Sequence, residues 1–305
     1  MRTRQKHLFL CVAAFSAVSA VAFAQPTPTS VFAAQAGRRY RITPNITYVT
    51  TNNFESKLDV YQLADATTPR ETLIFFHGGG WVQGTKEASS MQFLPYMEAG
   101  WNIVNVEYRL ARVSPAPAAA EDALCALRWT IRNAKQYNID PNRLIASGTS
   151  AGGHLALSIG MIPASAGLDR QCPGTEELKV AAIVNWYGIS DVPELLEGPN
   201  MKTYAVTWLG SAENRQGIAR RVSPITYIRP GLPPVISIQA DHDPTVPYEQ
   251  NVRLHAALEK AGVPNQLVTV QGNTHGNYKP SEYIRLYAAI QSFLSKQNLW
   301  SQAEP

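Results

Sequence analysis

Residues 144–154 read Leu-Ile-Ala-Ser-Gly-Thr-Ser-Ala-Gly-Gly-His, a short apolar run followed by a glycine-rich turn. The apolar run is typical of a buried strand, and the residues from His154 onward favour a helix. Between them stands Gly148-x-Ser150-x-Gly152. In a strand–turn–helix context this motif holds a nucleophilic serine at the tip of a strained turn, where glycines let the turn close and a substrate approach. An incidental serine in a glycine-rich turn is the alternative interpretation.

The first 24 residues have the pattern of an export signal. Basic residues at positions 2, 4 and 6 precede an apolar stretch over 8–21, and Ala22-Phe23-Ala24 is a small-x-small cleavage site. The apolar stretch is too short to be a convincing membrane span. We therefore expect residues 1–24 to be a signal peptide, and the mature protein to be exported, periplasmic or secreted, without stable membrane association.

Removing this leader changes the charge balance. It leaves 24 Lys and Arg against 23 Asp and Glu, so nothing favours nucleic acid or an acidic membrane as a partner. The remaining 281 residues are enough for one large α/β domain. They contain Cys125 and Cys172. An oxidising compartment allows a disulfide, but two cysteines fix no spacing pattern, so a bridge and two buried thiols stay open.

Strand and helix signals alternate from about residue 40 to residue 300, which we expect to form a single domain. Residues 25–39 show no periodicity and are predicted to be a flexible lead-in. Predicted strands cover 46–50, 58–63, 72–76, 102–106, 144–146, 180–186, 234–239 and 266–270, the first two joined by a turn at Asn52-Asn53. Predicted helices cover 87–98, 118–137, the stretch after Ser150, 248–261 and 281–295. The alternation predicts an α/β fold with a mostly parallel central sheet and helices on both faces.

Two stretches, 162–177 and 191–229, lack this alternation. The second is predicted to hold helices near Leu195 and Trp208 and to form a small partial cap. In parallel sheets ligands bind at the carboxyl ends of the strands, so we expect the functional residues in the loops that follow strands.

A glycine run directly follows the predicted strand at 72–76 and reads His77-Gly78-Gly79-Gly80-Trp81. Consecutive glycines let the main chain direct N–H groups at the oxyanion of a tetrahedral intermediate. A structural turn is the alternative, and a phosphate loop fits less well because no Gly-Lys-Ser/Thr follows. Gly79 and Gly80, with Ala151 after the serine, are the predicted oxyanion hole, and His77 is expected to hold the loop in place.

Two later loops contain acids and a histidine. Asp241 and Asp243 follow the predicted strand 234–239, and His275 follows the next one in a glycine-flanked loop. An acid in such a position can orient the imidazole of a catalytic histidine. The chain order Ser150, Asp243, His275 is that of the α/β-hydrolase fold, which favours a catalytic triad. Asp241 is the alternative acid, but Asp243 has more reach towards the His275 loop.

With these motifs the chain resembles the esterase/lipase α/β-hydrolases that have an HGGGW oxyanion loop. More narrowly, it resembles the secreted feruloyl esterase and acetylxylan esterase-like carboxylesterases of bacteria. The resemblance extends over about residues 55–296 and rests on the runs 77–84, 108–110, 140–144, 148–153, 223–227, 243–250 and 275–276. It implies the α/β-hydrolase fold and favours Asp243, which begins an Asp-x-x-Val-Pro run. Ala240 departs from the pattern, since similar enzymes usually have glycine there.

The motifs and the resemblance together predict a serine esterase that forms an acyl-enzyme and needs no metal or cofactor. Its expected substrates are acyl esters of plant polysaccharides or related small esters. An amide hydrolase of the peptidase or formamidase type would use the same catalytic residues. A non-catalytic binding protein on this fold generally lacks a member of the triad, and none is missing here. The sequence shows no cofactor fingerprint and no histidines at metal-ligand spacing.

Three aromatic residues are candidates for substrate binding. Trp81, directly after the glycine run, is expected at the mouth of the acyl site. Trp186 and Tyr187 end the predicted strand 180–186 and are expected to open onto the same face, with core packing as the alternative for Trp186. Aromatic walls suit a planar acyl group such as a cinnamoyl ring, or the apolar face of a sugar.

Overall fold

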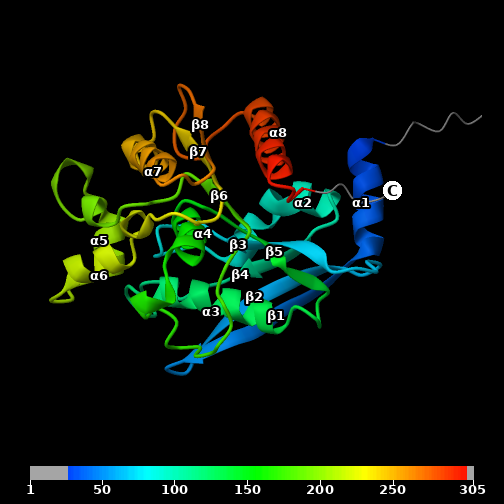
Figure 1. Cartoon of the computed structure of the whole chain (residues 1–305), viewed down its shortest axis with the longest axis horizontal. Coiled ribbons are helices and arrows are strands. Elements are labelled where there is room, and N and C mark those ends of the chain that lie inside the picture. The colour runs from blue at the N-terminus through cyan, green and yellow to red at the C-terminus, as the bar shows by residue number, and fades with distance from the viewer. Residues whose placement is uncertain (1–26, 301–305) are drawn as a thin grey trace, which may run out of the picture.

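The computed structural model describes residues 27–300, which are built around one eight-stranded sheet (Figure 1). The predicted signal peptide at 1–24 lies outside the described residues. The strands are β1 (Tyr40–Thr51), β2 (Phe54–Leu63), β3 (Arg70–Phe76), β4 (Asn102–Val106), β5 (Ile139–Thr149), β6 (Ala182–Trp186), β7 (Val235–Ala240) and β8 (Asn265–Val270). The α-helices are α1 (Pro28–Arg39), α2 (Leu94–Glu98), α3 (Ala118–Arg132), α4 (Ala151–Met161), α5 (Thr203–Leu209), α6 (Arg215–Arg221), α7 (Tyr248–Lys260) and α8 (Pro280–Lys296). Short 3-10 helices are η1 (Lys86–Phe93), η2 (Ala164–Ala166), η3 (Pro193–Leu195), η4 (Gly198–Asn200) and η5 (Pro224–Tyr227).

The sheet has the strand order β1-β2-β4-β3-β5-β6-β7-β8. The hairpin β1–β2 joins β4 in antiparallel fashion, and β4, β3, β5, β6, β7 and β8 run parallel. Parallel strands have helices on both faces, which explains why every residue of β4 and β6 is buried. The predicted fold class is confirmed. So is the hairpin turn, where Asn52 and Asn53 have positive φ values of 50° and 61°.

Helices cover both faces of the sheet. Buried leucines of α3, α4 and α7 share one core with one face, and aromatic and aliphatic residues of α2 and α8 form a second core on the other. Figure 1 shows α2 and α8 on the side of the sheet away from α3 and α7. Within residues 27–300, no helix is long and apolar enough to span a bilayer.

The prediction of a flexible lead-in over 25–39 is wrong for its larger part, because residues 28–39 form α1. Thr27 caps this helix by accepting a hydrogen bond from the Ser30 N–H at 3.1 Å, and Pro28 occupies the first turn. No residue of α1 is fully buried. The helix therefore lacks the apolar stripe by which a sequence pattern would detect it.

The helix predicted at 87–98 is also different, since residues 86–93 form the 3-10 helix η1 and only 94–98 are α-helical. Pro95 stands in the first turn of α2 and has no N–H to continue an α-helical ladder from η1.

The segment 191–229 is an insertion that holds η3, η4, α5, α6 and η5. The helices predicted near Leu195 and Trp208 are present as η3 and α5. Both Leu195 and Trp208 are fully buried. The insertion contacts the loops at the carboxyl ends of the strands: the Lys202 ammonium donates to the Pro244 carbonyl at 2.8 Å. It therefore forms a small cap beside the predicted site.

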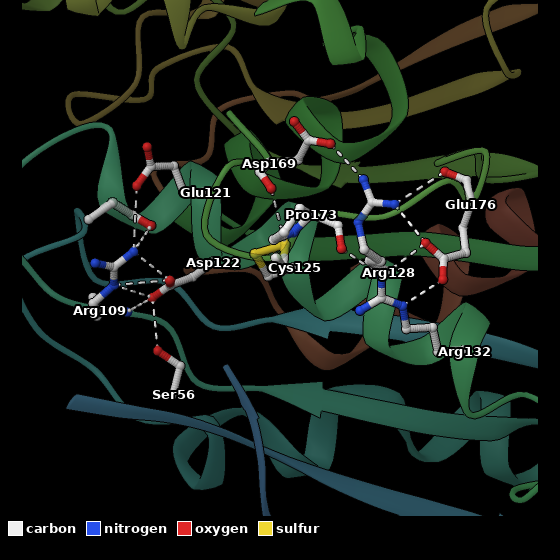
Figure 2. Close-up of a disulfide and its surroundings, with 12 residues drawn as sticks. Ser56, Arg109, Glu121, Asp122, Cys125, Arg128, Arg132, Asp169, Pro173 and Glu176 are labelled. Carbon is white, nitrogen blue, oxygen red and sulfur yellow. Dashed lines mark hydrogen bonds and ion pairs between the residues drawn. A yellow bond between two sulfur atoms is a disulfide. The ribbon is translucent and has the colours of Figure 1, made fainter. Parts of the chain in front are cut away.

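The second irregular segment, 162–177, is fastened to α3. Cys125 and Cys172 form a disulfide with their Cα atoms 5.6 Å apart, which settles the alternatives left open above (Figure 2). Close by, Arg128 pairs with Asp169 at 2.6 Å and with Glu176 at 2.8 Å. The bridge and the ion pairs hold this segment against α3, although its one regular element is the three-residue helix η2.

A buried carboxylate fixes the loop after β4. Asp122 on α3 accepts hydrogen bonds from the Arg109 backbone N–H at 2.8 Å, from its guanidinium at 2.7 Å and from the Ser56 hydroxyl at 3.0 Å (Figure 2). Two residues further along this loop, the Ala111 N–H donates to the Trp81 carbonyl at 2.8 Å. The Asp122 cluster thus supports the loop that follows the glycine run.

Candidate active site

Ser150 stands at a sharp turn between β5 and α4. Its φ and ψ are 55° and −118°, a conformation that few non-glycine residues adopt. The flanking glycines are required sterically. A Cβ on Gly148 would lie 2.5 Å from the Gly152 carbonyl, and one on Gly152 would lie 2.0 Å from the Phe76 carbonyl oxygen. The turn therefore packs directly on the end of β3. The strained turn between a strand and a helix is as predicted from the sequence.

His275 joins the serine to Asp243. Its Nε2 lies 2.9 Å from Ser150 Oγ, and its Nδ1 lies 2.7 Å from Asp243 Oδ2. Because a carboxylate only accepts hydrogen bonds, Nδ1 carries the proton and Nε2 is free to accept from the serine. Ser150 follows β5, Asp243 follows β7 and His275 follows β8, so the ends of three parallel strands at one edge of the sheet bring the three residues together.

Asp241, the alternative acid, is not part of this series. Its carboxylate accepts from His242 Nδ1 and from the Gly272 N–H, both at 2.8 Å. The His242 contact is the main cause that lowers the pKa of the Asp241 carboxyl. Asp241 instead fixes the start of the loop that carries His275.

The glycine run turns back on itself beside Ser150. Gly79 and Gly80 have φ values of 118° and 60°, and the N–H groups of Val82 and Gln83 both donate to the Gly79 carbonyl at 3.1 Å. A Cβ on Gly79 would lie 2.0 Å from the Gln83 carbonyl oxygen, so only glycine fits. Ala151 is the first residue of α4, where backbone N–H groups have no partner within the helix. The structure thus brings the predicted oxyanion residues to the serine.

These groups line one cavity of about 400 Å³. Its walls are Gly79, Gly80, Val82, Gln83, Ser150, Tyr187, Tyr204, Thr245, His275 and Gly276. Both aromatic walls are tyrosines. The Tyr187 ring meets the His275 imidazole edge-on with centroids 4.7 Å apart. The cavity lies at the carboxyl ends of the strands, where ligands of parallel sheets bind.

Tyr187 is placed as expected, but the position predicted for Trp81 is wrong. The Trp81 side chain is fully buried beneath the glycine loop, where it stacks on Trp208 of the cap and donates from Nε1 to His154 Nδ1 at 3.2 Å. Its backbone has a φ of 60°, continuing the left-handed turn of Gly80. This turn directs the indole inward, between α4 and the cap, and away from the mouth of the site.

The position predicted for Trp186 is also wrong. Its side chain packs against Tyr283 and Tyr287 of α8, with ring centroids 6.1 and 5.4 Å apart. Successive residues of a strand point to opposite faces, and the last residue of β6 points to the face that α8 covers. Of the three aromatic residues predicted to bind substrate, Tyr187 alone lines the cavity.

Tyr204 was not predicted from the sequence. It comes from α5 in the cap, and its hydroxyl donates to the Thr245 carbonyl at 2.9 Å. A Cβ on Gly80 would lie 2.8 Å from the Tyr204 Cβ, so the cap packs directly on the glycine loop. The only signal for this residue was its place in a segment predicted to cover the strand ends.

Two buried histidines support the loop and take no part in the triad. Burial lowers the pKa of His77 to about 4, and it lowers the pKa of His154 to about 4 as well. The His77 ring stacks on Tyr108 with centroids 4.3 Å apart, and its Nδ1 donates to the Gly78 carbonyl at 2.7 Å. Both imidazoles are therefore neutral at pH 7, in agreement with a supporting role for His77.

Within the described residues, no group of three or more His, Cys, Asp and Glu side chains is arranged to hold a metal ion.

Comparison with known families agrees with this geometry. The BD-FAE family model matches residues 58–258, more than half of the chain, and the match includes the glycine run, Ser150 and Asp243. The chain belongs to the BD-FAE family. His275 lies beyond the BD-FAE match and is placed by the structure.

Among curated proteins, this BD-FAE chain is similar to Esterase LipQ of Mycobacterium tuberculosis, with 28% identity over 254 residues that cover 79% of the chain and 59% of LipQ. It is 29% identical to the ethyl acetate hydrolase of Pseudomonas putida over 218 residues, 67% of the chain and 64% of that protein. The chain thus spans less than two thirds of the length of these relatives. Among solved structures, esterase 2 of Thermogutta terrifontis phosphoramylated by tabun superposes with a TM-score of 0.72 at 26% identity, covering 88% of this chain and 97% of esterase 2. The fold is the α/β-hydrolase fold of these esterases.

Proposed function

We propose that this protein is a serine carboxylic-ester hydrolase that works through an acyl-enzyme. The observation that carries the proposal is the hydrogen-bonded series Ser150–His275–Asp243, of which Ser150 and His275 line the same cavity as Gly79 and Gly80. The relatives support it, since LipQ is named an esterase and the Pseudomonas protein an ethyl acetate hydrolase.

In the acylation step, Ser150 Oγ attacks the carbonyl carbon of the ester and His275 Nε2 takes the hydroxyl proton. Asp243 stabilises the imidazolium that forms. The C–O bond to the alcohol then breaks, and the alcohol leaves with the proton from His275. Water, deprotonated by the same imidazole, then attacks the acyl-serine. The bond between the acyl carbon and Ser150 Oγ breaks, His275 returns the proton to Oγ, and the carboxylic acid leaves.

The negative charge that develops on the carbonyl oxygen needs fixed donors. The N–H of Ala151 and those of the Gly79–Gly80 turn meet this need at no cost of reorganisation during the reaction. The N-terminal end of α4 adds its positive dipole end behind Ser150.

We assign the substrates to acyl esters of plant polysaccharides or related small esters. The resemblance to feruloyl and acetylxylan esterases supports this class, as does a cavity of about 400 Å³ walled by Tyr187 and Tyr204. A planar aromatic acyl group fits between such walls.

We further propose that the protein is exported and then periplasmic or secreted. The basic start, apolar stretch and cleavage site of residues 1–24 support this. The Cys125–Cys172 disulfide suits an oxidising compartment. N-terminal sequencing of the protein recovered from the producing cells should begin at Gln25. A protein that retains Met1 and stays in the cytoplasm contradicts export.

The catalytic proposal is tested with a fluorophosphonate probe and an ester panel. The purified protein should take up one probe per chain at Ser150 and hydrolyse nitrophenyl esters. Ser150→Ala should abolish labelling and lower kcat by roughly 10⁶-fold. Ser158→Ala is the matched control, because it removes a buried hydroxyl from α4, the helix that follows Ser150, and this hydroxyl donates to the His154 carbonyl at 2.8 Å. Most activity remaining in Ser150→Ala contradicts the proposal.

The panel also tests the substrate class and the amide-hydrolase alternative. Feruloylated and acetylated saccharides, plain nitrophenyl esters and matched anilides are compared by kcat/KM. We expect esters to exceed their matched anilides and feruloylated saccharides to exceed plain acetate. A preference for anilides would reassign the protein to amide hydrolysis on the same residues.

A further inference from the structure

The carboxylate of Asp243 accepts a hydrogen bond from an amide outside the triad. Its Oδ1 accepts from the N–H groups of Thr245 and Val246 at 2.8 and 3.0 Å. Its Oδ2 accepts from His275 Nδ1 at 2.7 Å and also from Gln239 Nε2 at 2.8 Å. Gln239 and His275 thus donate to the same oxygen of Asp243, the one that orients the imidazole.

The orientation of the Gln239 amide follows from a directed series of hydrogen bonds. The series begins at the Gly188 N–H, which can only donate and does so to Asn185 Oδ1 at 2.9 Å. Asn185 therefore presents its Nδ2 to Asn251 Oδ1 at 2.9 Å, and Asn251 presents its Nδ2 to Gln239 Oε1 at 2.9 Å. Each amide has one orientation that satisfies both neighbours. Gln239 therefore presents its Nε2, and not its carbonyl, to Asp243 and to the Val246 carbonyl, which accepts at 3.2 Å.

The hydrogen-bonded series of Asn185, Asn251 and Gln239 is buried and joins three elements of the site. Asn185 on β6, Gln239 on β7 and Asn251 on α7 are all fully buried. A Cβ on Gly153 would lie 2.6 Å from Asn185 Oδ1, so the series also touches the helix that follows Ser150. In a water-excluded interior these bonds are strengthened, and each missing partner is costly.

We propose that Gln239 is a positioning residue for Asp243, and that the series Gly188–Asn185–Asn251 sets the direction of its amide. This inference rests on the proposed function, because Gln239 matters for turnover only if Asp243 orients His275. By donating to Oδ2, Gln239 fixes the position of the carboxylate oxygen that faces the imidazole. A carbonyl in the same place would repel that oxygen.

Besides its triad partner His275, the titratable groups that face Asp243 are the hydroxyls of Tyr187, Tyr204 and Tyr278, and these hydroxyls do not interfere with a test by pH. Burial is the main cause that raises the pKa of each tyrosine, and the charge of Asp243 adds to it. These hydroxyls therefore stay neutral where ester hydrolysis is measured.

Two exchanges at Gln239 test the donor. Gln239→Leu removes it and should lower kcat by about 10- to 100-fold with KM unchanged, the range expected for a hydrogen bond to a charged group. Gln239→Glu keeps the shape, but the introduced carboxyl donates to Asp243 only while it is protonated. Its kcat should therefore fall as the pH rises across the range in which the wild-type rate stays on its plateau.

A third exchange tests the direction of the series without touching Asp243. Asn251→Asp replaces the N–H that Gln239 Oε1 accepts by a carboxylate oxygen that repels Oε1, so the amide is displaced from the position in which it donates to Asp243. We expect kcat to fall although the changed residue has no bond to the triad. Gln250→Glu is the matched control: Gln250 is buried on the same helix and bonds to the backbone of Ser190 and Asp191. It should keep the wild-type kcat and pH profile.

The outcomes separate this inference from the proposed function. Wild-type kcat and pH profile in Gln239→Leu and Gln239→Glu overturn the inference, while labelling of Ser150 in the wild-type protein leaves the proposed function intact. A wild-type protein that neither hydrolyses esters nor takes up the probe overturns the proposed function itself. If Gln239→Leu does not fold, the isosteric Gln239→Glu decides, and a profile parallel to the wild type overturns the positioning role.

Discussion

The indole of Trp81 stacks on that of Trp208, with ring centroids 4.0 Å apart and planes inclined by 17°. Trp81 follows the glycine run and Trp208 belongs to α5 of the cap, so one contact fastens the cap to the loop that is proposed to bind the oxyanion. His154, four residues after Ser150, accepts the Trp81 N–H from the other side. Cap, loop and nucleophile turn therefore share one buried aromatic cluster.

Trp81→Ala should affect all ester substrates equally. The indole is fully buried and lines no part of the cavity, so its loss creates a void costing about 3–5 kcal/mol of stability and loosens the glycine turn. We expect kcat/KM for an acetyl ester and for a feruloyl ester to fall by the same factor. Trp101→Ala is the control, since it empties a fully buried site in the other core and should destabilise the fold while sparing kcat/KM. A selective loss on the feruloyl ester would return Trp81 to the substrate site.

The two neighbouring aspartates should differ sharply. Asp243→Asn should lower kcat by roughly 10⁴-fold, because an asparagine amide no longer fixes the tautomer in which Nε2 accepts the serine proton. Asp241→Asn should have little effect on kcat, since its carboxylate bonds to His242 and to the Gly272 N–H. Steady-state kinetics on one nitrophenyl ester distinguishes the variants. The reverse ranking would assign the acid to Asp241.

The features predicted correctly from the sequence depend on short stretches of neighbouring residues. Continuous apolar runs marked the parallel strands, and the glycines around Ser150 and at 79–80 stand where a side chain has no room. The chain order of Ser150, Asp243 and His275 followed from the fold class, because each comes from the end of a different strand.

What it missed depends on packing between distant segments. The side-chain direction of Trp81 depends on its φ of 60° and on a cap helix over 120 residues later in the chain. Trp186 and Tyr187 are adjacent, yet Trp186 packs in the core against α8 and Tyr187 lines the cavity. The difference depends on the side of the sheet to which each side chain points. The bonds of Gln239 to Asp243 and Asn251 join β7 to its own loop and to α7, and no sequence motif marks them.

Removing the disulfide should lower stability without changing turnover. Cys125 and Cys172 close a loop of 47 residues, for which the chain-entropy relation gives roughly 4 kcal/mol. The paired Cys125→Ala and Cys172→Ala exchange should lower the urea midpoint, while kcat at 25 °C is unchanged because neither cysteine lines the cavity. The wild-type protein with a reductant is the parallel sample and should shift in the same direction. A lowered kcat with an unchanged midpoint contradicts this role.

His154 should make the fold sensitive to acid. Burial lowers its pKa from the ordinary 6.5 to about 4, a shift that the hydrogen bond to the Val222 carbonyl only partly opposes. Between these two values the unfolded chain binds a proton that the folded protein does not, so stability is lost as the pH falls from about 6.5 towards 4. The loss between pH 7 and pH 5 is about 2 kcal/mol for this group.

His154→Gln keeps an acceptor for the Trp81 N–H and a donor for the Val222 carbonyl, but does not titrate. Urea unfolding at the two pH values should therefore show a drop that is smaller by about 2 kcal/mol in the variant than in the wild type. Equal drops in both proteins would mean that His154 is protonated inside the fold, and that Trp81 has lost its acceptor there.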